Sequence, residues 1–376
     1  MSTPPARPAA PAPQPPPGAP PSTMPPPPPI HPRTPPEPAS KPPQPAPSDV
    51  PVQPAFAAPP AVIAAAASRS GPADHGWRRL VRAVSFGLIN PGPSTAQREA
   101  AQLEAAIRTA LRGSHKVGVL GKGGVGKTSV AASIGSIFAE LRQQDRVVAI
   151  DADTAFGRLS SRIDPSASGS FWDLTAARDL QSFADVVARL GRNTVGLHVL
   201  PGEPAAGARR VLDPAIYREA VLRLDRHFAI SVIDCGSTMD APLTQEVLRD
   251  LDALIVVSSP WADGASAAAK TMEWLSDRRL TDLLRRSIVV LNDSDGHSDK
   301  RTRSVLAREF VDHGQRVVEV PFDPHLRPGG VIEVRHELAP ATRLKLLQIA
   351  AIIVEYFASR PDERRSRCPD ATTPAH

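Results

Sequence analysis

Residues 121–128 read Gly-Lys-Gly-Gly-Val-Gly-Lys-Thr, and this stretch decides the fold. It follows a short apolar run, KVGVL at 116–120, and opens a stretch with helical patterning. The spacing matches G-x-x-x-x-G-K-[ST] at every fixed position, in the strand–loop–helix context that the pattern requires. Glycines let backbone N–H groups turn inward around phosphate oxygens, and the helix N-terminus adds a favourable dipole. The sequence therefore predicts a phosphate-binding loop.

The side chains of this loop have predicted roles in holding a nucleotide. Lys127 is expected to reach the β and γ phosphates, and the Thr128 hydroxyl is expected to ligate Mg²⁺. The backbone N–H groups of the loop would surround the phosphate oxygens. The predicted nucleotide-binding residues here are Gly121, Lys122, Gly123, Gly124, Val125, Gly126, Lys127, Thr128 and Ser129.

Short apolar runs recur along the rest of the chain, separated by helical stretches. Several are apolar throughout, as expected of strands buried on both faces of a parallel sheet. Alternating strands and helices imply right-handed βαβ units, so we predict an α/β fold: a doubly wound, mostly parallel sheet with helices on both faces. Ligands of such folds bind at the carboxyl ends of the strands. The predicted strands are KVGVL (116–120), RVVAID (146–151), GLHVLPG (196–202), AISVIDCG (229–236), ALIVVSS (253–259), SIVVLND (287–293) and QRVVEVPF (315–322).

Carboxylates stand at the ends of two of these strands. Asp151 and Asp153 follow the second run, and Asp234 follows AISVI. Buried carboxylates are costly without a cation or a water network, and Mg²⁺ with ATP would supply both. The alternative for Asp151 and Asp153 is a helix-cap or turn role. Asp234, at a strand end beside the phosphate loop, has the Walker B arrangement and is predicted to hold Mg²⁺ through water.

Lys122 sets this loop apart, because an ordinary phosphate loop does not require a lysine at that place. The string KGGVGKT (122–128) resembles the deviant Walker A box of the MinD/ParA family of ATPases. The resemblance implies ATP and Mg²⁺ as cofactors, Mg²⁺-dependent ATP hydrolysis and an ATP-bound homodimer in which Lys122 crosses to the partner's nucleotide. The alternative for Lys122 alone is a solvated loop lysine.

The resemblance also assigns roles outside the loop. Asp153 is implied to position the attacking water, and Asp151 to support the water shell of the metal. Together the implied catalytic residues are Lys122, Lys127 and Asp153, and the implied metal-binding residues are Thr128, Asp151 and Asp234.

Two later strand ends are implied by the resemblance to hold the nucleotide base. Asn292 would contact adenine, although NDSDG (292–296) is also an ordinary turn string. Pro321 begins a Pro-x-Asp loop that would pack on the ring.

The chain divides by composition into four segments. Residues 1–60 contain 27 of the 43 prolines, and such a segment lacks a regular hydrogen-bond ladder and an apolar core. We expect a disordered Pro/Ala-rich tail over 1–75, which is either a partner ligand or a solubilising linker. The remaining segments are a basic linker and helix (76–113), the ATPase domain (114–358) and a flexible tail (359–376).

A helix is expected before the phosphate loop. Ser94 or Thr95 would cap it, it would run to about Arg112, and Gly113 would end it. The expected apolar face consists of Leu103, Ala106, Ile107, Ala110 and Leu111.

Residues 77–116 carry seven basic and two acidic side chains, which equals the net charge of +5 of the whole chain. A basic patch here would contact nucleic acid, anionic lipid or an acidic partner; the alternative is a solvated helix face. The basic residues are Arg78, Arg79, Arg82, Arg98, Arg108, Arg112 and Lys116.

Three features resemble the EspI-like group of MinD-like ATPases associated with actinobacterial type VII secretion. They are the proline-rich tail, INPGPS (89–94) and FDPHLRPGGVIEV (322–334). This resemblance implies a regulator or accessory of a secretion apparatus, with a protein partner. Two alternatives stay open: a nucleic-acid-binding partition or positioning ATPase, and an ATP-binding scaffold with little turnover.

The two cysteines, Cys235 and Cys368, fit a reducing compartment, and their placement disfavours the cluster that nitrogenase iron protein, a member of the resembled family, binds across its dimer. No apolar run reaches transmembrane length, and no signal pattern opens the chain. We therefore expect a cytoplasmic protein, with peripheral association at the inner face of the membrane through a partner as an option. The last helix, about 340–357, is expected to pack on the sheet; the alternative is a membrane-targeting amphipathic helix.

Overall fold

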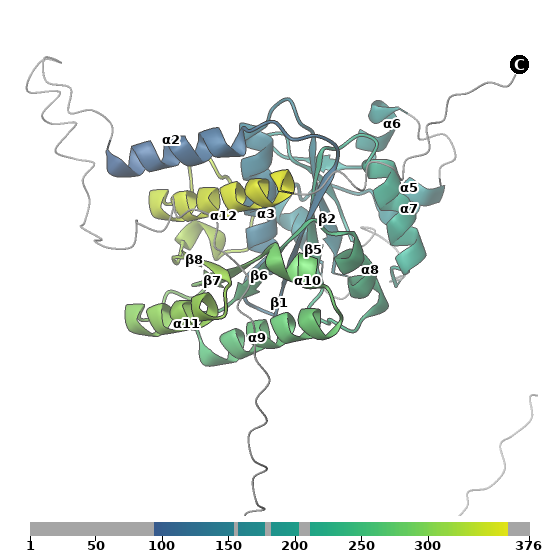
Figure 1. Cartoon of the computed structure of the whole chain (residues 1–376). Helices are drawn as coiled ribbons and strands as arrows, with labels where there is room; N and C mark the ends of the chain where they lie inside the picture. The colour runs from purple at the N-terminus through teal and green to yellow at the C-terminus, as the bar shows by residue number, and fades with distance from the viewer. Residues whose placement is uncertain (1–93, 154–156, 177–181, 203–210, 360–376) are drawn as a thin grey trace, which may run out of the picture. The chain divides into compact units, whose positions relative to one another are not determined.

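The computed structural model describes residues 94–153, 157–176, 182–202 and 211–359 (Figure 1). The chain divides into two units, Met1–Asp74 and His75–His376, and every described residue belongs to the second. The predicted proline-rich tail, most of the INPGPS string and the C-terminal tail after residue 359 lie outside the described residues.

An eight-stranded sheet forms the centre of the second unit, in the order β3-β4-β2-β5-β1-β6-β7-β8. All paired neighbours are parallel except β3 and β4. The seven predicted strands are all present, which confirms the doubly wound fold. Their bounds are β1 His115–Gly121, β2 Val147–Ala152, β4 His198–Leu200, β5 Ile230–Cys235, β6 Ala253–Ser258, β7 Ser287–Asn292 and β8 Arg316–Val320; the additional edge strand is β3, Gly191–Arg192.

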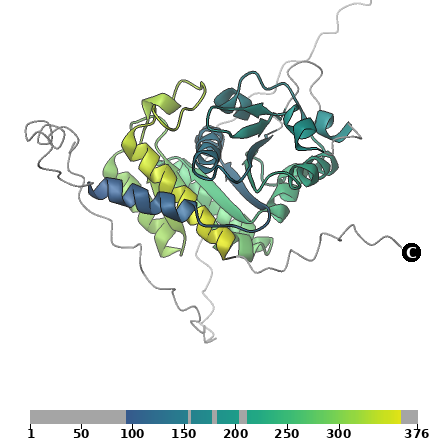
Figure 2. The same cartoon turned by 90° about the horizontal axis from the view of Figure 1, so that it is seen from above.

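Helices cover both faces of this sheet (Figures 1 and 2). Alternate strand residues supply the two apolar layers: in β2, Val147 and Ala149 join one layer, and Val148 and Ile150 join the other. On the first face lie α2 (Thr95–Ile107), α3 (Lys127–Leu141), α4 (Leu159–Ile163) and α12 (Pro340–Ala358). On the second lie α5 (Phe171–Ala176), α6 (Phe183–Val187), α7 (Pro214–Leu224), α8 (Pro242–Asp250), α9 (Ala262–Asp277), α10 (Thr281–Arg285) and α11 (Lys300–Asp312).

Helix α2 begins where the sequence predicts. The Ser94 hydroxyl accepts from the Gln97 N–H, and the Gln97 side chain accepts from the Ser94 N–H, which completes a capping box. The predicted end was wrong, because α2 stops at Ile107 and not at Arg112. The buried Arg142 donates to the carbonyls of Ile107 and Thr109, so these groups are satisfied by a side chain and not by further helical turns.

The predicted apolar face of this helix is only partly correct. Ile107 is fully buried, and Leu103 and Leu111 are half-buried against the same core. Ala106 and Ala110 are exposed.

Helix α12 confirms the prediction of a packing helix at the end of the domain. Leu346, Ile349, Ile353 and Phe357 are buried in the first apolar layer. In Figure 2, α12 lies beside α2 across this face, and both helices contact α3. None of the described helices is long and apolar enough to span a membrane.

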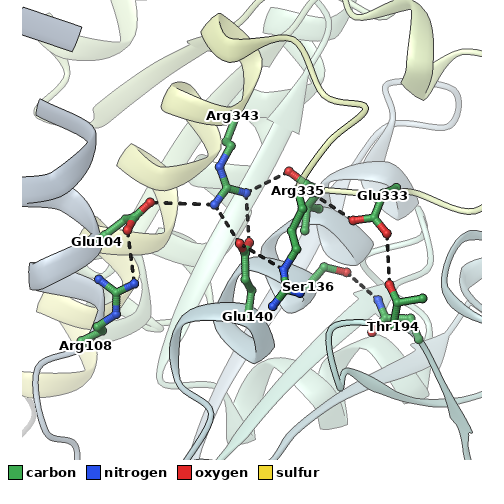
Figure 3. Close-up of polar contacts among 10 residues, drawn as sticks. Glu104, Arg108, Ser136, Glu140, Thr194, Glu333, Arg335 and Arg343 are labelled. Carbon is green, nitrogen blue, oxygen red and sulfur yellow. Dashed lines mark hydrogen bonds and ion pairs between the residues drawn. The ribbon is translucent and has the colours of Figure 1, made fainter. Parts of the chain in front are cut away.

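A polar network fastens the helices of this face to one another (Figure 3). Arg343 of α12 donates to both carboxylate oxygens of Glu140, at 2.9 and 3.1 Å, where Glu140 lies near the end of α3. Arg343 also lies 3.8 Å from Glu104 of α2, and Arg335 lies 3.4 Å from Glu140. Three helices and the segment before α12 are therefore held together by charge as well as by apolar contacts.

Lys116 is not part of the basic surface patch that the sequence predicts before the phosphate loop. The Lys116 side chain is 9% exposed, and its ammonium lies 2.6 Å from Asp225 and 2.7 Å from Asp250. Lys116 is therefore an internal ion-pair residue and does not belong to a surface patch. Arg98, Arg108 and Arg112 are exposed, as expected, and the arginines before residue 94 lie outside the described part.

Candidate nucleotide-binding site

The predicted phosphate loop joins β1 to α3 at the carboxyl edge of the sheet, where β1 lies between β5 and β6. Gly124 and Gly126 have φ values of 84° and 94°, a conformation that strains other residues. A Cβ at Gly124 would meet nothing within 4 Å, whereas one at Gly126 would lie 2.4 Å from the Asn292 amide nitrogen. The loop is therefore an open cradle lined by backbone, which fits phosphate oxygens.

Lys127 and Thr128 are the first two residues of α3, directly after the glycines of the loop. The Lys127 side chain is largely buried, and its ammonium lies 3.4 Å from the Lys122 carbonyl oxygen. The Thr128 hydroxyl donates to Asp234 Oδ2 at 2.6 Å. The second oxygen of Asp234 is buried and has no hydrogen-bond partner among the described residues. An unpartnered carboxylate oxygen beside a threonine hydroxyl fits a magnesium ion with its water shell.

Asp151 and Asp234 are cross-strand neighbours in the register of β2 and β5. Burial, and then the charge of Asp234, raises the pKa of Asp151 to about 8. Burial also raises the pKa of Asp234 to about 6, against the lowering effects of the Thr128 hydrogen bond and the Lys127 charge. Two buried carboxyl groups with raised pKa values favour a cation between them.

No group of three or more His, Cys, Asp or Glu side chains among the described residues is arranged to hold a metal by itself. A Mg²⁺ ion at this place would therefore keep water molecules and phosphate oxygens as ligands, as Mg²⁺ prefers. The residues present fit a magnesium–nucleotide complex better than a metal cage made of protein side chains.

Asp153 follows β2 at the same edge of the sheet. Its N–H donates to Asp151 Oδ1 at 3.2 Å. Its carboxylate lies near Gly236, because a Cβ at Gly236 would be 3.7 Å from Asp153 Oδ1. The structure thus brings the three predicted carboxylates to one place; their catalytic and metal-binding roles stay predictions.

Lys122 lies on the exposed rim of the loop. Its ammonium pairs with Asp263 at 2.6 Å, and the two side chains are 49% and 65% exposed. Asp263 is in the first turn of α9, after β6. Sequence reasoning missed Asp263; the available signal was an acidic residue just beyond the strand that neighbours β1.

The residues predicted to hold the base are near the loop, with contacts of their own. Asn292 ends β7, and its side-chain amide donates to the Val125 carbonyl at 2.9 Å, which ties the phosphate loop to β7. Pro321 follows β8 and is half-buried. Asp323 accepts from the N–H groups of His325 and Ala339, which is a structural role. Base recognition by Asn292 and Pro321 stays a prediction.

Comparison with known proteins assigns the family. The model of the CobQ/CobB/MinD/ParA nucleotide binding domain matches residues 118–328, more than half of the chain. The chain belongs to this family. The match begins in β1 and spans the phosphate loop, the three predicted carboxylates and the Pro321 segment.

Individual proteins are similar to this chain in sequence or in fold. The chain is 33% identical over 285 residues to the ESX-1 secretion-associated protein EspI of Mycobacterium tuberculosis, which covers 75% of this chain and 42% of that protein. It is 25% identical over 239 residues to an uncharacterized ATP-binding protein of Methanocaldococcus jannaschii, covering 62% and 85%. The Pyrococcus furiosus cell division ATPase MinD superposes with a TM-score of 0.50 at 20% identity, covering 64% and 98%. This chain thus matches less than half the length of EspI.

Proposed function

We propose that this protein is a Mg²⁺-dependent ATPase that works as a switch, closing into a homodimer with ATP and opening after hydrolysis. The observation that carries the proposal is the contact between Thr128 and Asp234 beside the open phosphate cradle, with one oxygen of Asp234 left unpartnered. That arrangement supplies a metal-side hydroxyl, a metal-side carboxylate and a phosphate site within one strand-end cluster.

The proposed residue roles are supported by the positions of these side chains. Lys127 binds the phosphates, and Thr128 and Asp234 hold the metal with its water, supported by Asp151. When bound, Mg²⁺ supplies charge that neutralises the phosphate oxygens. Asp153 stands at the edge of the cluster, where it orients water for attack on the terminal phosphate.

The homodimer is supported by the exposure of Lys122. Its ammonium is at the surface, so it can reach a second copy of the chain without rearrangement of the core. In this structure it pairs with Asp263 of the same chain. We propose that the dimer exchanges this pair for the nucleotide of the partner.

Similarity to EspI supports a role beside a type VII (ESX) secretion system, as a regulator or accessory with a protein partner. The match covers only 42% of EspI, so the role of the whole EspI protein is extended to this chain by proposal. Deletion of the gene in its host, complemented with wild type or Asp153→Ala, tests it. We expect secretion of ESX substrates to change on deletion and to recover only with the wild type; unchanged secretion on deletion would contradict the role.

Hydrolysis and dimerisation are tested together on the purified full chain. We expect phosphate release with Mg²⁺–ATP, its loss in Asp153→Ala, and loss of ATP-dependent dimers in Lys122→Ala as seen by light scattering after gel filtration. Lys270→Ala, an exposed lysine of α9, is the matched control. Tight ATP binding without turnover would indicate the scaffold alternative instead.

The nucleic-acid alternative stays a prediction, weakened by the burial of Lys116.

A further inference from the structure

Arg162, in the last turn of α4, is a half-buried cation with no acidic partner among the residues that the structure describes. Its Nη2 donates to Ser129 Oγ at 2.9 Å and to the Leu326 carbonyl at 2.9 Å. Its Nη1 donates to the Gly330 carbonyl at 3.2 Å. Among the described residues, no carboxylate lies within ion-pair distance of this guanidinium, and burial lowers its pKa. A guanidinium held only by neutral acceptors still attracts an anion.

The position of Arg162 indicates which anion it would meet. Ser129 comes directly after Thr128, in the first turn of the helix whose N-terminus faces the phosphates. Leu326 and Gly330 belong to the segment that follows Pro321, on the predicted base side of the site. Arg162 therefore bridges the phosphate side and the base side of the nucleotide site. The phosphate between terminal phosphates and base is the α-phosphate.

We propose that Arg162 is a positioning residue for the α-phosphate of the bound nucleotide, acting through the Ser129 hydroxyl. This inference rests on the proposed function. Because Ser129 Oγ accepts a hydrogen bond from Arg162, its own proton is free to donate elsewhere. The neighbouring positive charge strengthens that donation to an anion. Ser129 is thus prepared to donate to a phosphate oxygen, and Arg162 adds positive charge at the same place.

The proposed role of Arg162 differs from that of residues that contact the terminal phosphate. An α-phosphate contact is common to ATP, ADP and AMP, so the loss of Arg162 weakens all three by the same factor. A contact to the γ-phosphate, or a role in hydrolysis, would affect ATP alone.

Nucleotide affinity of the full chain tests the proposal, with ATP, ADP and AMP competing against a fluorescent ADP analogue. Arg162→Met is expected to weaken all three by about tenfold, the effect of one charge-assisted hydrogen bond. Arg162→Lys, which keeps the charge, should recover part of the affinity. Ser129→Ala should lower affinity too, and the double variant should lose less than the product of the two single losses.

Arg223→Met is the matched control. Arg223 is a half-buried arginine of α7 that donates to the carbonyls of Leu174 and Thr175 and pairs with Glu219, on the face of the sheet opposite to α3. It should change unfolding without changing nucleotide affinity. Unchanged affinity in Arg162→Met, a loss confined to ATP, or losses in Arg162 and Ser129 variants that simply multiply would each overturn the inference. A wild-type chain that binds no nucleotide would contradict the proposed function as well.

Discussion

At the scale of single residues, the internal cation Lys116 shows how this fold treats charge away from the site. Its ammonium pairs with Asp225 and Asp250, and its backbone N–H donates to Asp252. Lys116→Met would leave the half-buried carboxylates of Asp225 and Asp250 without their cation. Because both carboxylates keep some contact with solvent, we expect the variant to lower the free energy of unfolding by about 1–3 kcal/mol, measured by urea denaturation. The exposed Lys270→Met should leave it nearly unchanged, and an equal effect of both would contradict this assignment.

The buried Asp151 predicts a pH dependence of stability without Mg²⁺ and nucleotide. Its pKa is about 8 in the folded chain, against an ordinary value of 3.8. Between these values the folded state binds more protons, so the free energy of unfolding falls as pH rises, by at most about 1.4 kcal/mol per pH unit. Asp151→Asn should flatten this fall between pH 5 and pH 8 in urea denaturation. The exposed Asp277→Asn should follow the wild type, and identical slopes for all three would contradict the prediction.

The exposed pair between Lys122 and Asp263 predicts an effect on assembly. Because the dimer is proposed to break this pair, Asp263→Asn should favour it and lower the ATP concentration needed for dimers. The shift should be small, about threefold, since exposed pairs contribute little and are screened by salt. Analytical ultracentrifugation over an ATP series measures it, with Asp277→Asn as the control in the same helix. A higher ATP requirement in Asp263→Asn would contradict the proposal.

The sequence predicts the phosphate loop and its carboxylates because their chemistry depends on local spacing and on strand ends. Asp263 and Arg162 could not be predicted in the same way. Each contacts the loop from a helix far away in the sequence, and which side chain points at Lys122 or Ser129 is decided by packing. Asn292 lies between these cases: its strand end was predictable, but its hydrogen bond to Val125 was not.

At the scale of elements, apolar runs predict all seven parallel strands, since a buried parallel strand must be apolar on both faces. The two-residue strand β3 carries no such pattern. The end of α2 could not be predicted from nearby residues either. The side chain that binds the carbonyl at this end is Arg142, which follows α3 in the sequence.

This contact gives a prediction for α2 as an element. Arg142→Met removes the donors to the Ile107 and Thr109 carbonyls and the ion pair with Asp145. We expect the amides of α2 to exchange hydrogen faster while those of the central strands keep their protection. The exposed Arg98→Met is the control on the same helix. Equal acceleration in α2 and in β1 would mean that the whole domain has been destabilised, and would contradict a local role.

At the scale of the whole described unit, α2 and α12 lie outside the family match but inside the apolar core. Glu140 of the phosphate-loop helix contacts Arg343 of α12, which lies close to Glu104 of α2. The family domain of this chain is therefore covered on one face of the sheet by its own flanking helices, whereas the candidate site lies at the carboxyl edge of the sheet.

The pairing of these two helices has a consequence during synthesis. Helix α2 leaves the ribosome before any strand of the sheet, whereas α12, its principal neighbour, begins 233 residues after Ile107. At 5–20 residues per second the interval is roughly 10–50 s. A 13-residue helix is only marginally stable by itself in water. Helix α2 therefore gains its principal neighbour only after α12 has been synthesised, and until then its described helix contacts are those with α3.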